Sequence, residues 1–126
     1  MKSREALIRL KRFQVEEKRR QTAQIQSMIS EFERMEKELN DQVLAEQERS
    51  GIHDAGHFAY PTFAKAATQR RDNLAASEHA LKEQLAAAKA ACEEAEAELA
   101  KVEAIAERDQ ANDKHSSRQR TVPAHG

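Results

Sequence analysis

The sequence predicts an all-α protein, a long two-helix antiparallel coiled-coil hairpin over residues 1–108, followed by a disordered C-terminal tail. Three observations lead to this fold class. Two long, highly charged stretches lack helix-breaking residues, and their apolar residues recur at coiled-coil spacing. Between them, the segment Ser50–Pro61 holds two of the three glycines and one of the two prolines. We therefore place the turn of the hairpin at about residues 50–60.

The composition argues against a compact globular core. Of the 126 residues, 34% are charged and only 4% are aromatic, and alanine supplies much of the apolar fraction. This balance, with regular apolar spacing, is typical of coiled coils. No apolar run has the length of a membrane span or of a signal peptide. We expect a cytoplasmic protein, and the net charge of −1 gives no overall attraction to nucleic acid.

The first helix is expected from about Ser3, a suitable N-cap, to about Arg49. The polar stretch Glu16–Thr22 interrupts its apolar seam, which should weaken packing without ending the helix, because no residue there is a strong breaker. Beyond this stretch the apolar residues step by three and four, as in a coiled-coil seam. The apolar residues here are Ile25, Met28, Ile29, Phe32, Met35, Leu39 and Val43, and the steps from Ile25 through Met28, Phe32 and Met35 to Leu39 define the expected seam.

The second helix is expected from about Pro61 to about Arg108. Two apolar rows with seven-residue spacing run along it. The first row is Leu74, Leu81, Ala88, Ala95 and Val102, and the second is Leu85, Cys92, Leu99 and Ala106. Residues 109–126 are polar and show no periodicity, so we predict a disordered tail there.

The turn residues explain how the chain reverses. Gly51 suits the left-handed position that ends a helix, and Pro61 suits the first turn of the next one. Helices joined by a short turn become antiparallel neighbours. Folding about the turn places Phe32 near Leu74 and Val15 near Cys92.

The distribution of charge favours the same antiparallel pairing. The first twenty residues are mostly basic, and the far end of the second helix is rich in glutamate. Antiparallel folding sets these two ends side by side, whereas a parallel dimer of straight chains would set like charges together. Exposed ion pairs contribute only a few tenths of a kcal/mol each, so they select the orientation more than they stabilise it.

No pattern in the sequence predicts catalysis, a cofactor or a metal. There is no phosphate-binding loop, nucleophile elbow or paired acid motif, and a two-helix hairpin offers no enclosed pocket. His53, Asp54 and His57 have some ligand character, but solvated turn residues are the favoured interpretation. Cys92 lies on the apolar stripe and is interpreted as a small packed residue.

Two features suggest protein partners. Phe58, Tyr60 and Phe63 place three of the five aromatic residues at the turn, where they either anchor a partner or cap the end of the hairpin; the sequence leaves both open. The basic cluster Lys18–Arg20 can contact an acidic partner, although a solvated helix face is favoured.

The chain resembles the FliJ family of flagellar type III export proteins, particularly the alphaproteobacterial forms, over about residues 1–108. The resemblance is carried by the segments Leu7–Phe13 and Glu16–Arg20, and by His57–Phe63 leading into Gln69–Leu74. It implies a non-enzymatic, stalk-like hairpin whose partners are the export ATPase hexamer (FliI type), the membrane export gate (FlhA type) and export chaperones. It also implies a peripheral position at the cytoplasmic face of the inner-membrane export apparatus.

The resemblance assigns residues to two binding regions. It places the gate contact at the tip and the ATPase contact at the paired chain ends. The tip set is Phe58, Tyr60, Phe63, Ala67 and Leu74, and the end set is Arg4, Arg9, Arg12, Glu98 and Glu103. The sequence departs from the family pattern late in the first helix, where tyrosines can occur and this chain has Gln42, Ala45 and Gln47.

Two other functions fit the same composition. A generic structural or self-associating coiled-coil scaffold would share the heptads without the specific partners. Nucleic-acid binding through the basic first helix would require salt-dependent affinity for DNA, and no aromatic residues accompany the basic cluster to stack on bases.

Overall fold

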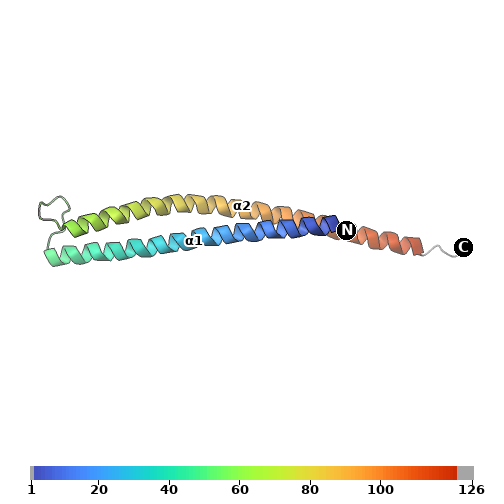
Figure 1. The fold of residues 1–126 in the computed structure, drawn as a ribbon, viewed down its shortest axis with the longest axis horizontal. Coiled ribbons are helices and arrows are strands. Elements are labelled where there is room, and N and C mark those ends of the chain that lie inside the picture. Colours follow the sequence, from blue (N-terminus) through green and yellow to red (C-terminus); the bar gives the residue numbers. More distant parts are fainter. Residues whose placement is uncertain (1, 122–126) are drawn as a thin grey trace. The chain divides into compact units, whose positions relative to one another are not determined.

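The computed structural model is a helical hairpin, as predicted. It describes the backbone of residues 2–121 and the side chains of residues 3–115. Two helices, α1 (Lys2–Ser50) and α2 (Thr62–Thr121), are joined by a turn over residues 51–61 (Figure 1). The described residues form no strand, and they include no helical stretch whose length and apolarity would suit it to crossing a bilayer.

The chain divides into two units. The central unit, Thr22–Ala88, contains the turn, and the terminal unit combines Met1–Gln21 with Lys89–Gly126. The boundary in α1 falls at the end of the polar stretch that interrupts the apolar seam. The helix continues through this stretch without a break, as its lack of strong breakers predicts.

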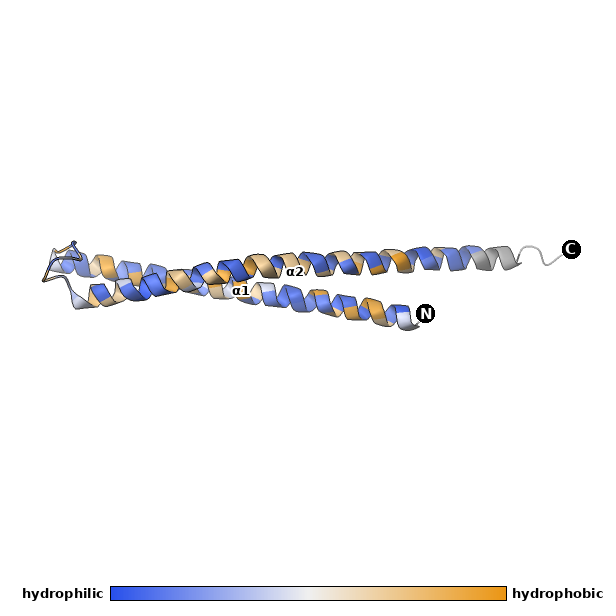
Figure 2. Ribbon diagram, turned by 90° about the horizontal axis from the view of Figure 1, so that it is seen from above, coloured by the Kyte–Doolittle hydropathy of each residue, from blue (hydrophilic) through white to orange (hydrophobic). Residues whose placement is uncertain are grey.

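The seam of α1 in the central unit differs from the predicted one. Ile29 and Val43 are buried, whereas Met28, which we placed in the seam, is 42% exposed. The true seam contains Glu36, seven residues after Ile29 and seven before Val43, and its side chain is half-buried. The other predicted seam residues, Ile25, Phe32, Met35 and Leu39, are half-buried, so the prediction is wrong at Met28 and omits Glu36, whose carboxylate a search for apolar spacing does not find. Figure 2 shows the resulting alternation of apolar and polar residues along the helix.

The two predicted rows of α2 are confirmed. Leu81 and Ala106 are buried, and the other members of both rows are half-buried. Towards the turn the rows continue through residues the prediction did not include, because Ala64, Ala67 and Glu78 are also buried. Alanines at these positions allow close approach of the partner helix, while Glu78 places a second carboxylate in the seam.

Cross-helix ion pairs in the terminal unit confirm the predicted antiparallel match of basic and acidic ends. Each joins a basic residue of α1 to an acidic residue of α2. The pairs are Arg4–Asp109 at 2.8 Å, Lys11–Glu98 at 3.0 Å, Arg12–Glu103 at 3.1 Å and Arg19–Glu96 at 3.4 Å.

These pairs also correct the predicted register. Val15 lies midway between Lys11 and Arg19, whose partners are Glu98 and Glu96, so it is level with that segment and not with Cys92. The shift is about one helical turn.

The second helix ends later than predicted. We expected a tail from residue 109, but α2 continues to Thr121, and Asp109 pairs with Arg4. The segment contains no glycine or proline before Pro123, so residues 109–121 hold no strong helix breaker. Residues 122–126 of the expected tail lie outside the described residues.

Candidate partner-binding surfaces

The tip of the central unit begins where α1 ends at Gly51. Gly51 has a φ of 74°, and its N–H donates to the Gln47 carbonyl at 2.8 Å. This left-handed residue closes the helix, as predicted. The Ser50 hydroxyl then accepts a hydrogen bond from the Ile52 N–H at 3.2 Å, which fixes the second residue beyond the helix.

The remainder of the turn is held by short-range hydrogen bonds. The Asp54 carboxylate accepts from the Gly56 N–H at 2.9 Å, and the His57 Nδ1 accepts from the Ala59 N–H at 3.0 Å. The Pro61 carbonyl accepts from the Lys65 N–H at 3.1 Å, so Pro61 leads directly into α2, as predicted. The turn is therefore a hydrogen-bonded segment of defined conformation and not an unconstrained loop.

The three aromatic residues of the tip have different environments. Phe58 is 97% exposed and stacks on the His57 ring at 4.7 Å, and Phe63 is 54% exposed. Tyr60 is half-buried, and its hydroxyl accepts a hydrogen bond from the Gln47 amide at 3.0 Å. Tyr60 thus ties the turn to α1, while the two phenylalanines are available to a partner. The sequence left open whether these aromatics cap the hairpin or anchor a partner. Tyr60 has the capping role, whereas Phe58 and Phe63 keep the exposure that a partner anchor needs.

The other two predicted tip residues also differ in accessibility. Ala67 is 3% exposed, so it packs against α1 and presents no surface to a partner. Leu74 lines a groove of about 350 Å³ together with Met35 and Leu39, and Arg70 lies at its edge. The groove is a shallow apolar feature on the side of the central unit, which the linear sequence did not indicate.

The predicted charged set at the chain ends lies in the terminal unit, where most of it is already paired. Arg4, Arg12, Glu98 and Glu103 each form a cross-helix ion pair. Arg9 is exposed beside Glu5 and Ile8. These side chains hold the helices together, and a partner would meet them as compensated pairs.

An apolar surface of the terminal unit was missed by the sequence reasoning. Leu7, Leu10 and Phe13 of α1 are 42%, 50% and 60% exposed, and Ile105 of α2 is 53% exposed. We call these four residues the apolar flank. Their neighbours Ile8 and Ala106 face the seam. The sequence could have indicated this surface, because the apolar flank consists of apolar residues that lie outside the seam rows.

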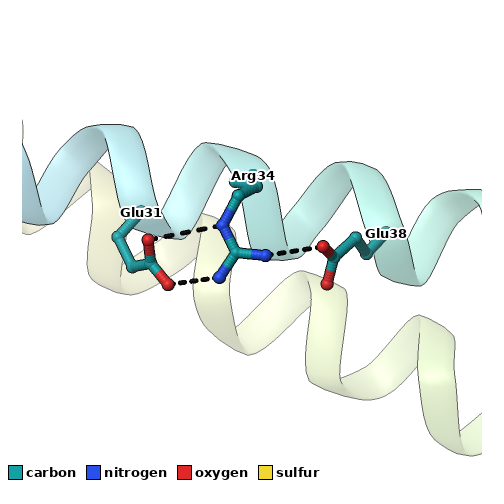
Figure 3. Close-up of polar contacts among 3 residues, drawn as sticks. All are labelled: Glu31, Arg34 and Glu38. Atoms are coloured by element: carbon teal, nitrogen blue, oxygen red, sulfur yellow. Dashed lines mark hydrogen bonds and ion pairs between the residues drawn. The ribbon is translucent and has the colours of Figure 1, made fainter.

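The exposed face of α1 in the central unit is held by ion pairs within the helix. The Arg34 guanidinium bridges Glu31 and Glu38, one turn away on either side (Figure 3). The hydrogen bond from Arg34 holds the pKa of Glu31 below its usual value. Pairs at this spacing support a helix with little apolar character, so this face is a solvated surface that needs no partner.

Two carboxylates meet in the seam of the central unit. The hydrogen bond with Glu78, together with burial, raises the pKa of Glu36, while hydrogen bonds with Glu36 and Lys82 lower the pKa of Glu78. The Lys82 ammonium lies 2.9 Å from the Glu78 carboxylate and keeps it ionised, although Glu78 is the more buried of the two. Of the two carboxylates, Glu36 is therefore the one that takes up a proton first as the pH falls.

Potential metal ligands are numerous in the sequence but do not cluster among the described residues. The described residues contain no group of three or more histidine, cysteine or acidic side chains placed to hold a metal ion. Asp54 and the His57 Nδ1 are instead used as acceptors within the turn.

Cys92 is half-buried in the terminal unit, and its thiol donates to the Glu96 carboxylate at 3.4 Å. Burial, and secondly Glu96, raise the pKa of this thiol. We expect maleimide at pH 7.5 to label the folded chain at least about threefold more slowly than the chain in denaturant, because only the thiolate reacts. Equal rates in the two conditions would show that Cys92 is neither shielded nor perturbed.

Comparison with protein-family models, with curated proteins and with solved structures found no match to this chain.

Proposed function

We propose that this chain is a non-enzymatic, stalk-like coupling protein of the flagellar type III export apparatus, of the FliJ type. The observation that carries the proposal is the ordered tip of a two-helix hairpin, which presents Phe58 at 97% and Phe63 at 54% exposure. Exposed phenylalanines leave apolar surface in water and do not stabilise a solvated turn, and exposed aromatic anchors are typical of binding surfaces. The resemblance in sequence then suggests which partners are involved.

In this proposal the tip contacts a membrane export gate of the FlhA type. Phe58 and Phe63 are the anchors, and the groove at Leu74 extends the same surface along the central unit. Tyr60 and Ala67 act indirectly: Tyr60 fixes the turn through Gln47, and Ala67 packs inside the unit. The proposed gate-binding residues of the tip are thus reduced to the three with accessible side chains, Phe58, Phe63 and Leu74.

The terminal unit would occupy the centre of an export ATPase hexamer of the FliI type. Its cross-helix ion pairs hold the two chain ends together as one body, and Arg9 adds an exposed positive charge. A partner contact through such charges weakens as salt rises. Export chaperones are further partners in the proposal, which places the protein in the cytoplasm, peripheral to the membrane through protein contacts.

The tip is tested by replacing Phe63 with alanine. We expect at least about a tenfold loss of binding to the soluble part of the gate protein, because a central aromatic anchor often contributes that much. Swimming motility should fall with it, while helicity measured by circular dichroism stays unchanged because Phe63 packs little within the hairpin. Met28→Ala, a change at a 42% exposed residue of α1, is the matched control and should leave both readouts intact.

Normal motility and normal gate binding by the Phe63→Ala and Phe58→Ala double variant would refute the tip assignment. Co-purification of the full chain with the export ATPase of the same organism tests the other contact independently.

A further inference from the structure

One side of the terminal unit carries both protruding apolar side chains and a groove. The apolar flank supplies Leu7, Leu10 and Ile105. Beside them lies a groove of about 500 Å³, whose small residues Ala91 and Ala95 form its floor between longer polar side chains. Phe13 borders this groove and is itself 60% exposed.

Heptad spacing shows that these features share one side. Leu7, Gln14 and Gln21 follow one another at seven-residue intervals on α1, and so do Ala91, Glu98 and Ile105 on α2. Residues seven apart on paired helices lie on nearly the same face. Because Gln14, Gln21, Ala91 and Glu98 line the groove, Leu7 and Ile105 lie further along that same side.

The levels of these residues are fixed by ion pairs. Leu7 and Ile105 both lie between the Arg4–Asp109 and Lys11–Glu98 pairs, so they stand beside each other across the two helices. The groove at Ala91 and Ala95 lies on the other side of the Lys11–Glu98 pair. Protrusion and groove therefore follow one another along a single surface.

The charges on this side are of both signs. Glu94 lines the groove, and Lys101 lies seven residues further along α2, towards Ile105. Both are exposed, and neither forms an ion pair with another described residue. A partner of uniform charge would be repelled by either Glu94 or Lys101. A second copy of the same surface in the opposite orientation sets Lys101 of each copy opposite Glu94 of the other.

We propose that this side of the terminal unit binds a second copy of the chain through a two-fold axis level with Val15, midway between Lys101 and Glu94 along α2. Each copy places Leu10 and Ile105 in the groove of the other, and Lys101 of each faces Glu94 of the other. A two-fold contact uses the same patch on both copies. The patch on each copy must therefore contain both the protruding side chains and the groove that receives those of the other copy. The inference stands apart from the export function proposed above.

The contact is a weak one. Four partly exposed apolar side chains supply less than the roughly 800 Å² per partner of a standard stable interface. We therefore expect a dissociation constant of about 10–100 µM, with dimer formed at high protein concentration and monomer at low.

Sedimentation velocity of the full chain from about 1 µM to 1 mM tests the inference, with a shift from monomer to dimer as the expected result. Leu10→Glu should weaken the dimer at least tenfold. The control is Leu44→Glu, at a 52% exposed leucine of the central unit against 50% for Leu10, which should leave the dimer unchanged. A monomer at every concentration, or equal loss in both variants, overturns the inference.

A charge exchange tests the two-fold geometry. Lys101→Glu alone and Glu94→Lys alone should each weaken the dimer, because each sets like charges against one another. The double variant restores the opposite-sign pairing between copies and should recover most of the affinity. Failure of the double variant to recover, with helicity retained, would show that these residues do not face each other and would overturn the proposed contact.

Discussion

Replacing Ile29 by aspartate should lower the melting temperature of the hairpin by more than about 10 °C, whereas the same change at Met28 should lower it by less than about 3 °C. Ile29 is 7% exposed in the seam of the central unit, and Met28 is 42% exposed beside it. An unpaired carboxylate in a seam costs several kcal/mol, because it loses water and gains no partner. The nearby acidic residues Glu36 and Glu78 add repulsion.

The pair of variants is its own control. Aspartate has the same intrinsic helix propensity at both positions, so the difference between them reports burial alone. Thermal unfolding followed by circular dichroism at pH 7 measures it. If Met28→Asp were the more damaging change, the seam would run through Met28, as the apolar spacing first suggested.

Heptad pattern and turn chemistry together predicted the fold. The rows of α2 were found correctly because alanine, leucine and valine mark them without a polar interruption near the middle of the helix. The seam of α1 was predicted only in part: Met28 was placed in it wrongly, and Glu36 was left out because a search for apolar spacing does not find a carboxylate. Its burial becomes tolerable only beside Glu78 and Lys82, which lie more than forty positions away in the sequence.

The candidate surfaces were predicted less completely. The exposed phenylalanines of the tip followed from composition, because a two-helix end cannot bury three aromatics. The pairing of Arg4 with Asp109 could not be foreseen, since it depends on the register. The burial of Ala67 could have been, because Ala67 lies seven residues before Leu74 in the predicted row. The register in turn depends on how many residues the turn consumes, and that number is set by hydrogen bonds at Asp54 and His57.

Glu36 gives the central unit an unusual dependence on pH. Its pKa in the folded chain is raised above the ordinary value of 4.5, so the folded state binds this proton more tightly than the unfolded state. The resulting stability is present below pH 4.5 and is lost as the pH rises through the folded pKa. The lowered pKa values of Glu78, Glu31 and Glu46 act in the opposite sense, and their contribution is lost as the pH falls below 4.5.

Glu36→Leu should therefore raise the melting temperature at pH 7 by about 5 °C, because an ionised seam carboxylate next to Glu78 is replaced by an apolar side chain of similar size. In the unmodified chain the melting temperature should increase as the pH falls from 7 to 4.5, because Glu36 takes up its proton above its ordinary pKa. That increase should be absent in the variant, which has no proton to gain at this position.

Glu36→Gln separates packing from protonation. The amide of glutamine donates a hydrogen bond to Glu78 at every pH, as protonated Glu36 does, so this variant should lose the pH dependence while gaining less stability than leucine provides. Lys82 remains paired with Glu78 in both variants. Should both variants keep the full increase between pH 7 and pH 4.5, the proton would belong to another group and the seam carboxylates would be independent of each other.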